Sequence, residues 1–332
     1  MSARIPCYLV RERSDKVTGS VEAIHEQDLP PGEVTIDVEC SSLNYKDALA
    51  CKGHPGIATN LPHIPGIDCS GVVSQSESEE YQPGDRVLLT GYDFGVSHWG
   101  GFCAKVRVSA EWVVPLPAEL SSRDAMLYGT AGFTAAQCVM AITERIQPED
   151  GEVLVTGATG GVGVWSVALL SKLGYQVVAA SGKPERKAAL IQIGATRVVP
   201  REEILGDPAR PLLKSVWAAA VDTVGGEPLS SVIRSIKYRG VVASCGLVAG
   251  DRTDLSLYPL LLRGMTLAGI DWAKCPRDSR LEIWRRLSGV WRIDLPDELI
   301  HEGNLADVST LATEMLQGER FGRTLITPQA EG

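Results

Sequence analysis

A glycine-rich turn in the middle of the chain has the composition of a phosphate-binding site. The stretch VTGATGGVG (155–163) follows an apolar run at 152–155 that is typical of a buried strand, and apolar residues then recur at helical spacing over 162–173. Such a turn leaves the first N–H groups of the helix without intrahelical acceptors, so a pyrophosphate can bind there. The pattern is G-x-x-G-x-x-G rather than the usual G-x-G-x-x-G, and an ordinary glycine-rich turn stays the alternative.

The end of the next predicted strand carries groups that suit a phosphate. In a site for NAD, an acidic residue about 20 residues further on normally binds the ribose 2′-hydroxyl. Here the strand ends in Ser181, Gly182 and Lys183, which offer a hydroxyl, a backbone N–H and a cation but no carboxylate. Arg201, just after the third predicted strand, is a further candidate contact. These residues predict NADPH as the cofactor, and the alternative is that Lys183 is a solvated surface lysine.

Two patterns of secondary structure supply these positions. Up to about residue 120, short β-like runs such as EVTIDVEC and RVLLTGY alternate with Pro and Gly, which indicates a barrel-like β domain. From about residue 125, predicted strands alternate with helices at 162–173 and 184–193, which indicates a parallel sheet with crossover helices. After about residue 295 we expect a helix and a final strand, RTLITP, that return to the first domain.

Composition limits the classes of function. The 332 residues, 44% of them hydrophobic, allow two domains and a large core. A formal charge of -9 opposes binding to a phosphate backbone, so we expect no nucleic-acid partner. No apolar stretch approaches 18 residues and charges interrupt the N-terminal segment, so we expect a cytoplasmic protein without membrane span or signal peptide. The eight cysteines have no C-x-x-C or metal spacing, which predicts reduced, mostly buried thiols.

Six motifs extend over nearly the whole chain: SLNYKDALA, PHIPGIDCSGVV, LLTGYDFGVSHWGGF, GTAGFTAAQCVMA, VTGATGGVG and SCGLVAG. Together they resemble the medium-chain dehydrogenase/reductase superfamily, and within it the zinc-free group of acrylyl-CoA reductases and quinone oxidoreductases. The resemblance implies an α/β fold with a GroES-like, β-barrel-type catalytic domain (1–124), a Rossmann domain with a doubly wound parallel sheet (125–295) and a return to the catalytic domain (296–332). It also implies NADPH as the cofactor and a homodimer.

Two positions differ from the zinc alcohol dehydrogenase branch of that superfamily. Asn44 stands about where that branch has a cysteine ligand, and Gly66, Ile67 and Asp68 stand where it has Gly-His-Glu. We therefore expect no metal. An alcohol oxygen is hard to polarise without a Lewis acid. An activated alkene is a better substrate, because hydride can attack the carbon β to its carbonyl while the charge moves to an enolate oxygen.

That reaction needs hydrogen-bond donors at the oxygen and a proton for the α carbon. The stretch LNYKD supplies both types, so Tyr45 and Asn44 are the candidate catalytic residues. A well-placed donor to a developing oxyanion contributes about 3–4 kcal/mol. The resemblance implies that Tyr45 also contacts the cofactor, so positioning of the nicotinamide stays open, as does packing without a chemical role. We expect Asp47 and Asp68 to brace their turns.

The resemblance implies further contacts to the cofactor. They come from Thr130, which is expected to begin the helix that faces the nicotinamide, and from Thr159, Gly160, Gly161, Val162, Leu247, Leu261 and Arg323. His98 and Trp99 are expected either to touch the substrate or to pack within their own loop.

Three functions stay open from the sequence. The first is NADPH-dependent reduction of the double bond of acrylyl-CoA to propionyl-CoA, and the second is reduction of quinones or small enones. The third is an NADPH-binding protein with a structural or RNA-binding role. The acidic charge argues against RNA, and the intact NYKD motif argues against a purely structural protein. The expected partner is thus a small molecule: an acyl-CoA, an enone or a quinone.

An apolar strand is predicted at the edge of the nucleotide domain. The stretch MTLAGID (265–271) contains Met265, Leu267 and Ile270, which are too apolar for a solvent-exposed edge. Pairing with the same strand of a second copy would satisfy its backbone groups, and the resemblance implies such a dimer. The alternative is that the chain's own C-terminal helix covers this edge.

Overall fold

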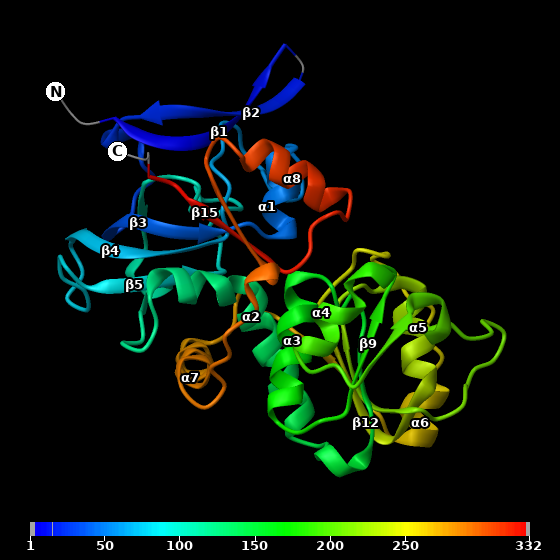
Figure 1. Ribbon diagram of the computed structural model, residues 1–332. Helices are drawn as coiled ribbons and strands as arrows, with labels where there is room; N and C mark the ends of the chain where they lie inside the picture. The colour runs from blue at the N-terminus through cyan, green and yellow to red at the C-terminus, as the bar shows by residue number, and fades with distance from the viewer. Residues whose placement is uncertain (1–3, 15, 330–332) are drawn as a thin grey trace. The chain divides into compact units, whose positions relative to one another are not determined.

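The computed structural model describes residues 4–14 and 16–329, and the chain forms two compact units. The first unit contains the residues up to Thr130, the segment Ala273–Ser288 and the residues from Ile300 onward. The second unit contains Ala131–Trp272 and Gly289–Leu299. In Figure 1 the blue and cyan segments and the red C-terminal segments belong to the first unit, and the green and yellow segments are mostly those of the second.

The first unit is built on a seven-stranded sheet and a separate hairpin. The hairpin strands are β1 (Ile5–Arg13) and β2 (Lys16–Ile24), and the sheet strands are β3 (Val34–Ser42), β4 (Asp68–Ser76), β5 (Arg86–Thr90), β6 (Lys105–Val108), β7 (Val114–Pro115), β14 (Ile300–Asn304) and β15 (Arg323–Thr327). The sheet has the order β14-β15-β3-β4-β5-β7, and β6 pairs with β3. Residues Val34, Ile36 and Val38 of β3 are buried at two-residue spacing, so one face of this strand lies in the core.

The helices of the first unit are α1 (Tyr45–Cys51), α7 (Arg277–Ser288), α8 (Val308–Leu316) and the first part of α2 (Ser122–Thr143). α8 packs against α1, and both lie beside the β1–β2 hairpin in Figure 1. α2 is long and apolar enough to cross a membrane, but 83% of its apolar window is buried inside the protein and the helical dihedrals are interrupted at Gly129. Both features are typical of a core helix.

The second unit is a six-stranded parallel sheet with helices between its strands. The strands are β8 (Val153–Val155), β9 (Val177–Ser181), β10 (Arg197–Pro200), β11 (Trp217–Asp222), β12 (Ile236–Ser244) and β13 (Thr266–Gly269). The helices are α3 (Gly161–Lys172), α4 (Lys187–Gln192), α5 (Gly226–Ser235) and α6 (Tyr258–Arg263). The helix predicted at 184–193 begins as a 3-10 turn, Pro184–Arg186, before α4 starts.

The strand order β10-β9-β8-β11-β12-β13 is that of a doubly wound sheet. The chain winds outward from β8 in one direction through β10, and then in the other direction from β11 to β13. Leu154, Val178, Ala220 and Val242, one from each of four neighbouring strands, lie in the same core cluster. The predicted α/β fold class is therefore confirmed, with a β-rich first unit and a doubly wound parallel sheet in the second.

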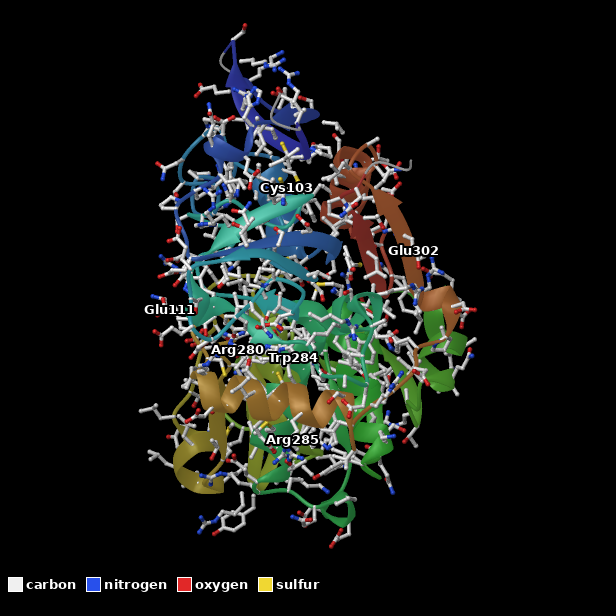
Figure 2. The ribbon with its side chains drawn as sticks, turned by 90° about the vertical axis from the view of Figure 1, so that its left-hand side faces the viewer. Cys103, Glu111, Arg280, Trp284, Arg285 and Glu302 are labelled. Atoms are coloured by element: carbon white, nitrogen blue, oxygen red, sulfur yellow. The ribbon has the colours of Figure 1, made fainter. Side chains whose placement is uncertain are left out.

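The segment Ala273–Ser288, which we expected in the nucleotide domain, lies instead in the first unit. The guanidinium of Arg280 on α7 is fully buried and donates to the carbonyl (2.7 Å) and hydroxyl (2.9 Å) of Thr90 at the end of β5. Trp284 is buried on the same side of the helix, whereas Arg285 lies on the opposite side (Figure 2). Contacts between residues 190 positions apart thus decide where this helix packs.

Candidate active site

Tyr45 lies at the first position of α1 and keeps an accessible side chain. β3 ends at Ser42, and Asn44 precedes the helix in an extended conformation (φ -117°, ψ 162°). The side chain of Tyr45 is 39% exposed, and its hydroxyl has no hydrogen-bond partner among residues 4–14 and 16–329. The hydroxyl is therefore available to donate to a ligand.

Asn44, by contrast, has its amide fully engaged inside the protein. Its Nδ2 donates to Oδ2 of Asp68 (3.0 Å) and Oδ2 of Asp47 (3.2 Å). Its Oδ1 accepts a hydrogen bond from Arg323 Nη1 (3.2 Å), and the residue is 8% exposed. These bonds leave no amide hydrogen free for a substrate oxygen, so the geometry favours a positioning role for Asn44 over the oxyanion donor that the sequence suggests.

Asp47 ties the start of α1 to the loop before β4. Its Oδ1 accepts from the N–H groups of Gly66 (3.1 Å) and Ile67 (2.8 Å), and its Oδ2 accepts from the N–H of Asn44 (2.8 Å). Burial, with the charge of Asp68 adding to it, raises the pKa of Asp47 to about 7, while the N–H donors act in the opposite direction. All of these partners are donors, so the arrangement is built for the carboxylate form.

The buried carboxylate of Asp68 and the buried guanidinium of Arg323 form the centre of this network. Asp68 accepts from the N–H (3.0 Å) and hydroxyl (2.9 Å) of Ser42 and from the N–H of Thr130 (2.9 Å). Arg323 donates through Nη2 to the hydroxyl of Ser42 (2.6 Å) and through Nε to the carbonyl of Leu127 (2.8 Å). Burial lowers the pKa of Arg323, and the charges of Asp68 and Asp47 oppose that shift. Sequence reasoning assigned Asp68 only to its turn, and no local signal marks it as the centre of a network.

The interruption of α2 at Gly129 makes this network possible. Gly129 has φ 49° and ψ -152°, which frees the carbonyl of Leu127 for Arg323 and the N–H of Thr130 for Asp68. A Cβ at Gly129 would lie 2.6 Å from Oδ2 of Asp68 and 2.8 Å from Nη2 of Arg323, so only glycine fits. Thr130 therefore begins the second part of α2, and the structure places Arg323 inside the first unit with its guanidinium engaged.

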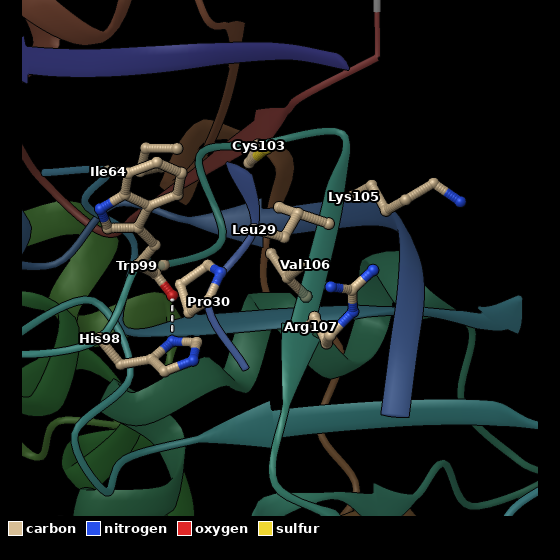
Figure 3. A pocket seen from close by; sticks show the side chains of 10 residues that line it. Leu29, Pro30, Ile64, His98, Trp99, Cys103, Lys105, Val106 and Arg107 are labelled. Atoms are coloured by element: carbon tan, nitrogen blue, oxygen red, sulfur yellow. Dashed lines mark hydrogen bonds between the residues drawn. The ribbon is translucent and has the colours of Figure 1, made fainter. Parts of the chain in front are cut away.

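The loop that contains His98 and Trp99 packs against its own unit. Figure 3 shows both residues lining a shallow hollow with Pro30 and Cys103, and the dashed line marks the bond from His98 Nδ1 to the carbonyl of Trp99 (2.8 Å). The indole N–H of Trp99 donates to the carbonyl of Pro62 (3.1 Å). Asn44, Tyr45 and Asp47 do not line this hollow, so the geometry favours loop packing over substrate contact.

In the second unit, the glycines of the turn at 157–163 have distinct roles. Gly157 has φ +57°, and a Cβ there would collide with the hydroxyl of Thr223. A Cβ at Gly163 would collide with the carbonyl of Gly157, so this glycine allows α3 to approach β8 closely. Gly160, the N-cap of α3, is exposed, and a Cβ there would meet only the Gly157 carbonyl at 3.4 Å. An exposed helix start of this kind can accept a pyrophosphate, and contacts of the cofactor with the stretch from Thr159 to Val162 stay a prediction.

The candidate groups for a 2′-phosphate lie together at the carboxyl ends of β9 and β10. Ser181 is paired in register with Pro200, directly before Arg201. The N–H of Lys183 donates to the hydroxyl of Ser181 (3.0 Å), and the side chain of Arg201 passes within 3.3 Å of where a Cβ on Gly182 would be. Arg201 also bonds the neighbouring Glu202 (2.9 Å). The Ser181 hydroxyl, the backbone N–H of Lys183 and the Arg201 side chain thus lie near the strand end where a site for NAD would carry an acid.

The structure does not bring Leu247 and Leu261, two further predicted cofactor contacts, to the groups around Ser181. Leu247 follows β12 and is 64% exposed, and Leu261 lies on α6 and is 77% exposed. No hydrogen bond between described residues joins either one to the glycine turn. Their contacts with a cofactor stay predictions that rest on the resemblance.

Comparison with known proteins gives two family matches in this chain. Residues 30–118 match the model described as "Alcohol dehydrogenase GroES-like domain", and residues 161–288 match the model described as "Zinc-binding dehydrogenase". Among named relatives, acrylyl-CoA reductase AcuI of Ruegeria pomeroyi is 43% identical over 96% of this chain and 97% of its own length. A Bacillus subtilis protein named "Putative quinone oxidoreductase YhfP" is 40% identical over 98% of this chain and 99% of its own length.

Solved structures give the same relationship. The yhdH oxidoreductase of Salmonella enterica, in complex with NADP, is 45% identical and superimposes with a TM-score of 0.93 over 97% of this chain and 99% of that one. The YhfP protein of Bacillus subtilis, solved with NAD bound, is 40% identical and also has a TM-score of 0.93, over 98% of this chain and 100% of that one.

Proposed function

The chain belongs to the medium-chain dehydrogenase/reductase family, and we propose that it uses NADPH to reduce the activated C=C bond of acrylyl-CoA to propionyl-CoA. The observation that carries the proposal is the accessible hydroxyl of Tyr45, held on a turn whose other polar groups bind one another. The 43% identity to an acrylyl-CoA reductase supports the substrate class.

NADPH fits the second unit, and when bound it would supply the hydride. Relatives have been solved with NADP and with NAD, so the preference depends on this chain's own residues. The hydroxyl of Ser181 bonds the N–H of Lys183, and the Arg201 side chain lies beside Gly182, which supports a role for these three residues in holding a 2′-phosphate. Each charge-assisted hydrogen bond contributes roughly 1.5–3 kcal/mol, so two or three would favour NADPH over NADH at least several hundredfold.

Tyr45 would act on the substrate carbonyl. Its hydroxyl donates to the carbonyl oxygen, and this hydrogen bond strengthens as charge moves to the enolate oxygen, a contribution of about 3–4 kcal/mol. Asn44 and Asp47 hold the backbone turn that carries Tyr45, and Asp68 holds Asn44. The backbone that carries the donor is therefore fixed before substrate binds, which favours a preorganised hydrogen bond.

The side chains near Tyr45 do not fit a catalytic zinc. The described residues contain no group of three or more His, Cys, Asp or Glu side chains that could hold a metal ion. The oxygens of Asp47 and Asp68 already accept N–H groups from Asn44 and the backbone. Arg323 adds a buried guanidinium beside them. We propose that the reaction is independent of zinc and that donors from the chain carry out the polarisation.

A second candidate function is reduction of quinones or small enones. The 40% identity to YhfP, named as a quinone oxidoreductase, favours it, and the hydroxyl of Tyr45 could donate to a quinone oxygen equally well. A purely structural NADPH-binding protein fits less well, because it would not need an accessible donor on a braced turn.

The proposal includes a homodimer that acts in the cytoplasm on small molecules, without nucleic-acid or membrane partners. β13 is the last strand in its sheet, and the N–H of Ile270 donates to the carbonyl of Ser244 on the inner side. Because backbone direction alternates along a strand, the N–H groups of Leu267 and Gly269 face the open edge. Met265 and Leu267 already pack in the core of their own unit, so the support for pairing with a second copy is the row of backbone groups at the open edge of β13.

Steady-state assays with NADPH test the function. We expect acrylyl-CoA to be reduced with kcat/KM of about 10⁴–10⁶ M⁻¹s⁻¹, and quinones to react much more slowly. Crotonyl-CoA serves as a control, because it is a thioester of the same coenzyme A and differs from acrylyl-CoA only by one additional methyl group. A quinone that reacts faster than both acyl-CoA substrates would replace the first proposal with the second.

A further inference from the structure

Asp222 is a buried carboxylate at the crevice of the second unit that the proposed chemistry does not use. It is the last residue of β11 and is fully buried. β8 and β11 are neighbours at the point where the strand order reverses, and dinucleotides bind in the crevice at such a point. Asp222 thus lies between the half of the sheet that carries the glycine turn and the half that carries the loops after β11 and β12.

The carboxylate of Asp222 joins the ends of three strands. Its Oδ1 accepts from the hydroxyl of Thr156 (2.8 Å), which directly follows β8. Its Oδ2 accepts from the N–H of Gly225 (2.9 Å), just before α5, and from the hydroxyl of Ser244 (3.4 Å) at the end of β12. Its backbone carbonyl accepts from the N–H of Cys245 (2.9 Å). Every one of these partners donates, so the site is built for the charged carboxylate.

The contact with Thr156 continues to the glycine turn. The hydroxyl oxygen of Thr156 accepts from the N–H of Thr223 (3.0 Å), so its own hydrogen is directed at Asp222. The hydroxyl of Thr223 donates to the carbonyl of Thr156 (2.8 Å) and lies where a Cβ on Gly157 would be. Asp222 therefore fixes the first glycine of the turn through two threonines.

We infer that Asp222 is a positioning residue that sets the glycine turn against the loops after β11 and β12, so that both halves of one dinucleotide fit at once. The inference rests on the proposed use of NADPH. An amide at this position would place N–H donors against either the N–H of Gly225 or the directed hydroxyl of Thr156. Either the glycine turn or the loop before α5 would then move, while the other stayed in place.

The test compares a whole dinucleotide with a fragment of it. Calorimetric titration of Asp222→Asn should give a Kd for NADPH at least tenfold weaker than that of the wild type. The Kd for 2′-AMP, which reaches only the groups around Ser181, should stay within about twofold. Lys183→Ala is the matched control and should weaken both ligands, because both carry the 2′-phosphate. Thermal unfolding without ligand shows whether each variant is folded.

Two results would overturn the inference: unchanged NADPH binding in Asp222→Asn, or equal losses for NADPH and 2′-AMP. If Asp222→Asn does not fold, Thr156→Val removes the hydroxyl between Asp222 and Thr223 and keeps the carboxylate and the side-chain shape. That variant should show the same selective loss for NADPH to a smaller degree, and wild-type affinity for NADPH would contradict the inference. A wild-type protein that binds neither ligand would instead refute the proposed function.

Discussion

Tyr45 has the most direct chemical role among the residues of the proposed site. Replacing Tyr45 with Phe removes one hydroxyl from a side chain that makes no hydrogen bond within the described chain. We expect kcat for acrylyl-CoA to fall about 10²- to 10³-fold, as for the loss of one oxyanion donor, with an unchanged Kd for NADPH. Steady-state kinetics and a fluorescence titration measure the two quantities. A change confined to the KM for NADPH would assign Tyr45 to cofactor binding.

One buried histidine, His63, makes a defined contribution to the pH dependence of the first unit. Burial lowers the pKa of His63 to about 4, and its Nε2 lies 3.0 Å from the carbonyl of Gly95, a contact that fits the neutral ring. Below pH 6.5 the unfolded chain binds a proton that the folded chain excludes. The contribution of His63 to the free energy of unfolding should therefore fall by up to about 1.4 kcal/mol per pH unit as the pH drops from 6.5 toward 4, while the raised pKa of Asp47 acts in the opposite direction.

Urea unfolding over that pH range, on the wild type and on His63→Gln, measures this contribution. Gln keeps a donor for the Gly95 carbonyl and does not titrate, so the variant should lose part of the slope. Identical slopes for the two proteins would show that His63 is not the source of the pH dependence.

At the residue scale, the sequence suggested two candidate donors but could not show how their side chains are connected. The stretch LNYKD pointed to Tyr45 and Asn44 because their side-chain types suit an enolate oxygen. It could not show that the amide of Asn44 donates a hydrogen bond to Asp68, or that Arg323, 279 positions away, donates one to Asn44. Such partners meet only in the folded chain, and one sequence carries no local pattern for them.

At the scale of elements, the interruption of α2 is the feature on which the network depends. Gly129→Ala would force a Cβ to within 2.6 Å of Asp68 Oδ2 at a residue with φ 49°. We expect a loss of about 2–4 kcal/mol in the free energy of unfolding, from left-handed backbone strain and overpacking together, and a lower kcat. Gly318→Ala is the control, because it has φ +73° with nothing within 4 Å of the added Cβ.

The control measures the cost of a Cβ at a residue with positive φ and open surroundings, which should be about 1–2 kcal/mol with kcat unchanged. Denaturant unfolding and steady-state assays on both variants make the comparison. Equal losses in the two variants would mean that the contacts of Gly129 with Asp68 and Arg323 add nothing.

The elements themselves were largely predictable, because their signals are local. The apolar run before Gly157 and the helical spacing after it correspond to β8 and α3 within a residue or two. The sequence placed the segment of α7 in the nucleotide domain, whereas it lies in the first unit. Its position depends on the hydrogen bond from Arg280 to Thr90, which a local pattern does not reveal. The expectation that a helix begins at Thr130 agrees with the break at Gly129, but the helical segment before that glycine was not predicted.

At the scale of the whole molecule, the proposed dimer depends on one strand edge. Leu267→Pro removes an N–H that faces the open edge of β13 and leaves the inner ladder with β12 intact. We expect the variant to shift toward monomer in light scattering at micromolar concentration. Ala268→Pro is the contrasting variant, because its N–H faces β12 and its loss should destabilise the second unit itself. A wild-type monomer would show that this interface is wrong.

The central claim is that the chain delivers hydride to the carbon β to an activated carbonyl. The most direct test is to incubate the enzyme with acrylyl-CoA and NADPH deuterated at the transferred position of the nicotinamide, and to locate the label in the product by NMR. The account predicts propionyl-CoA with one deuterium on its β carbon and none on its α carbon. Deuterium on the α carbon, or no propionyl-CoA while a quinone is reduced, would contradict it.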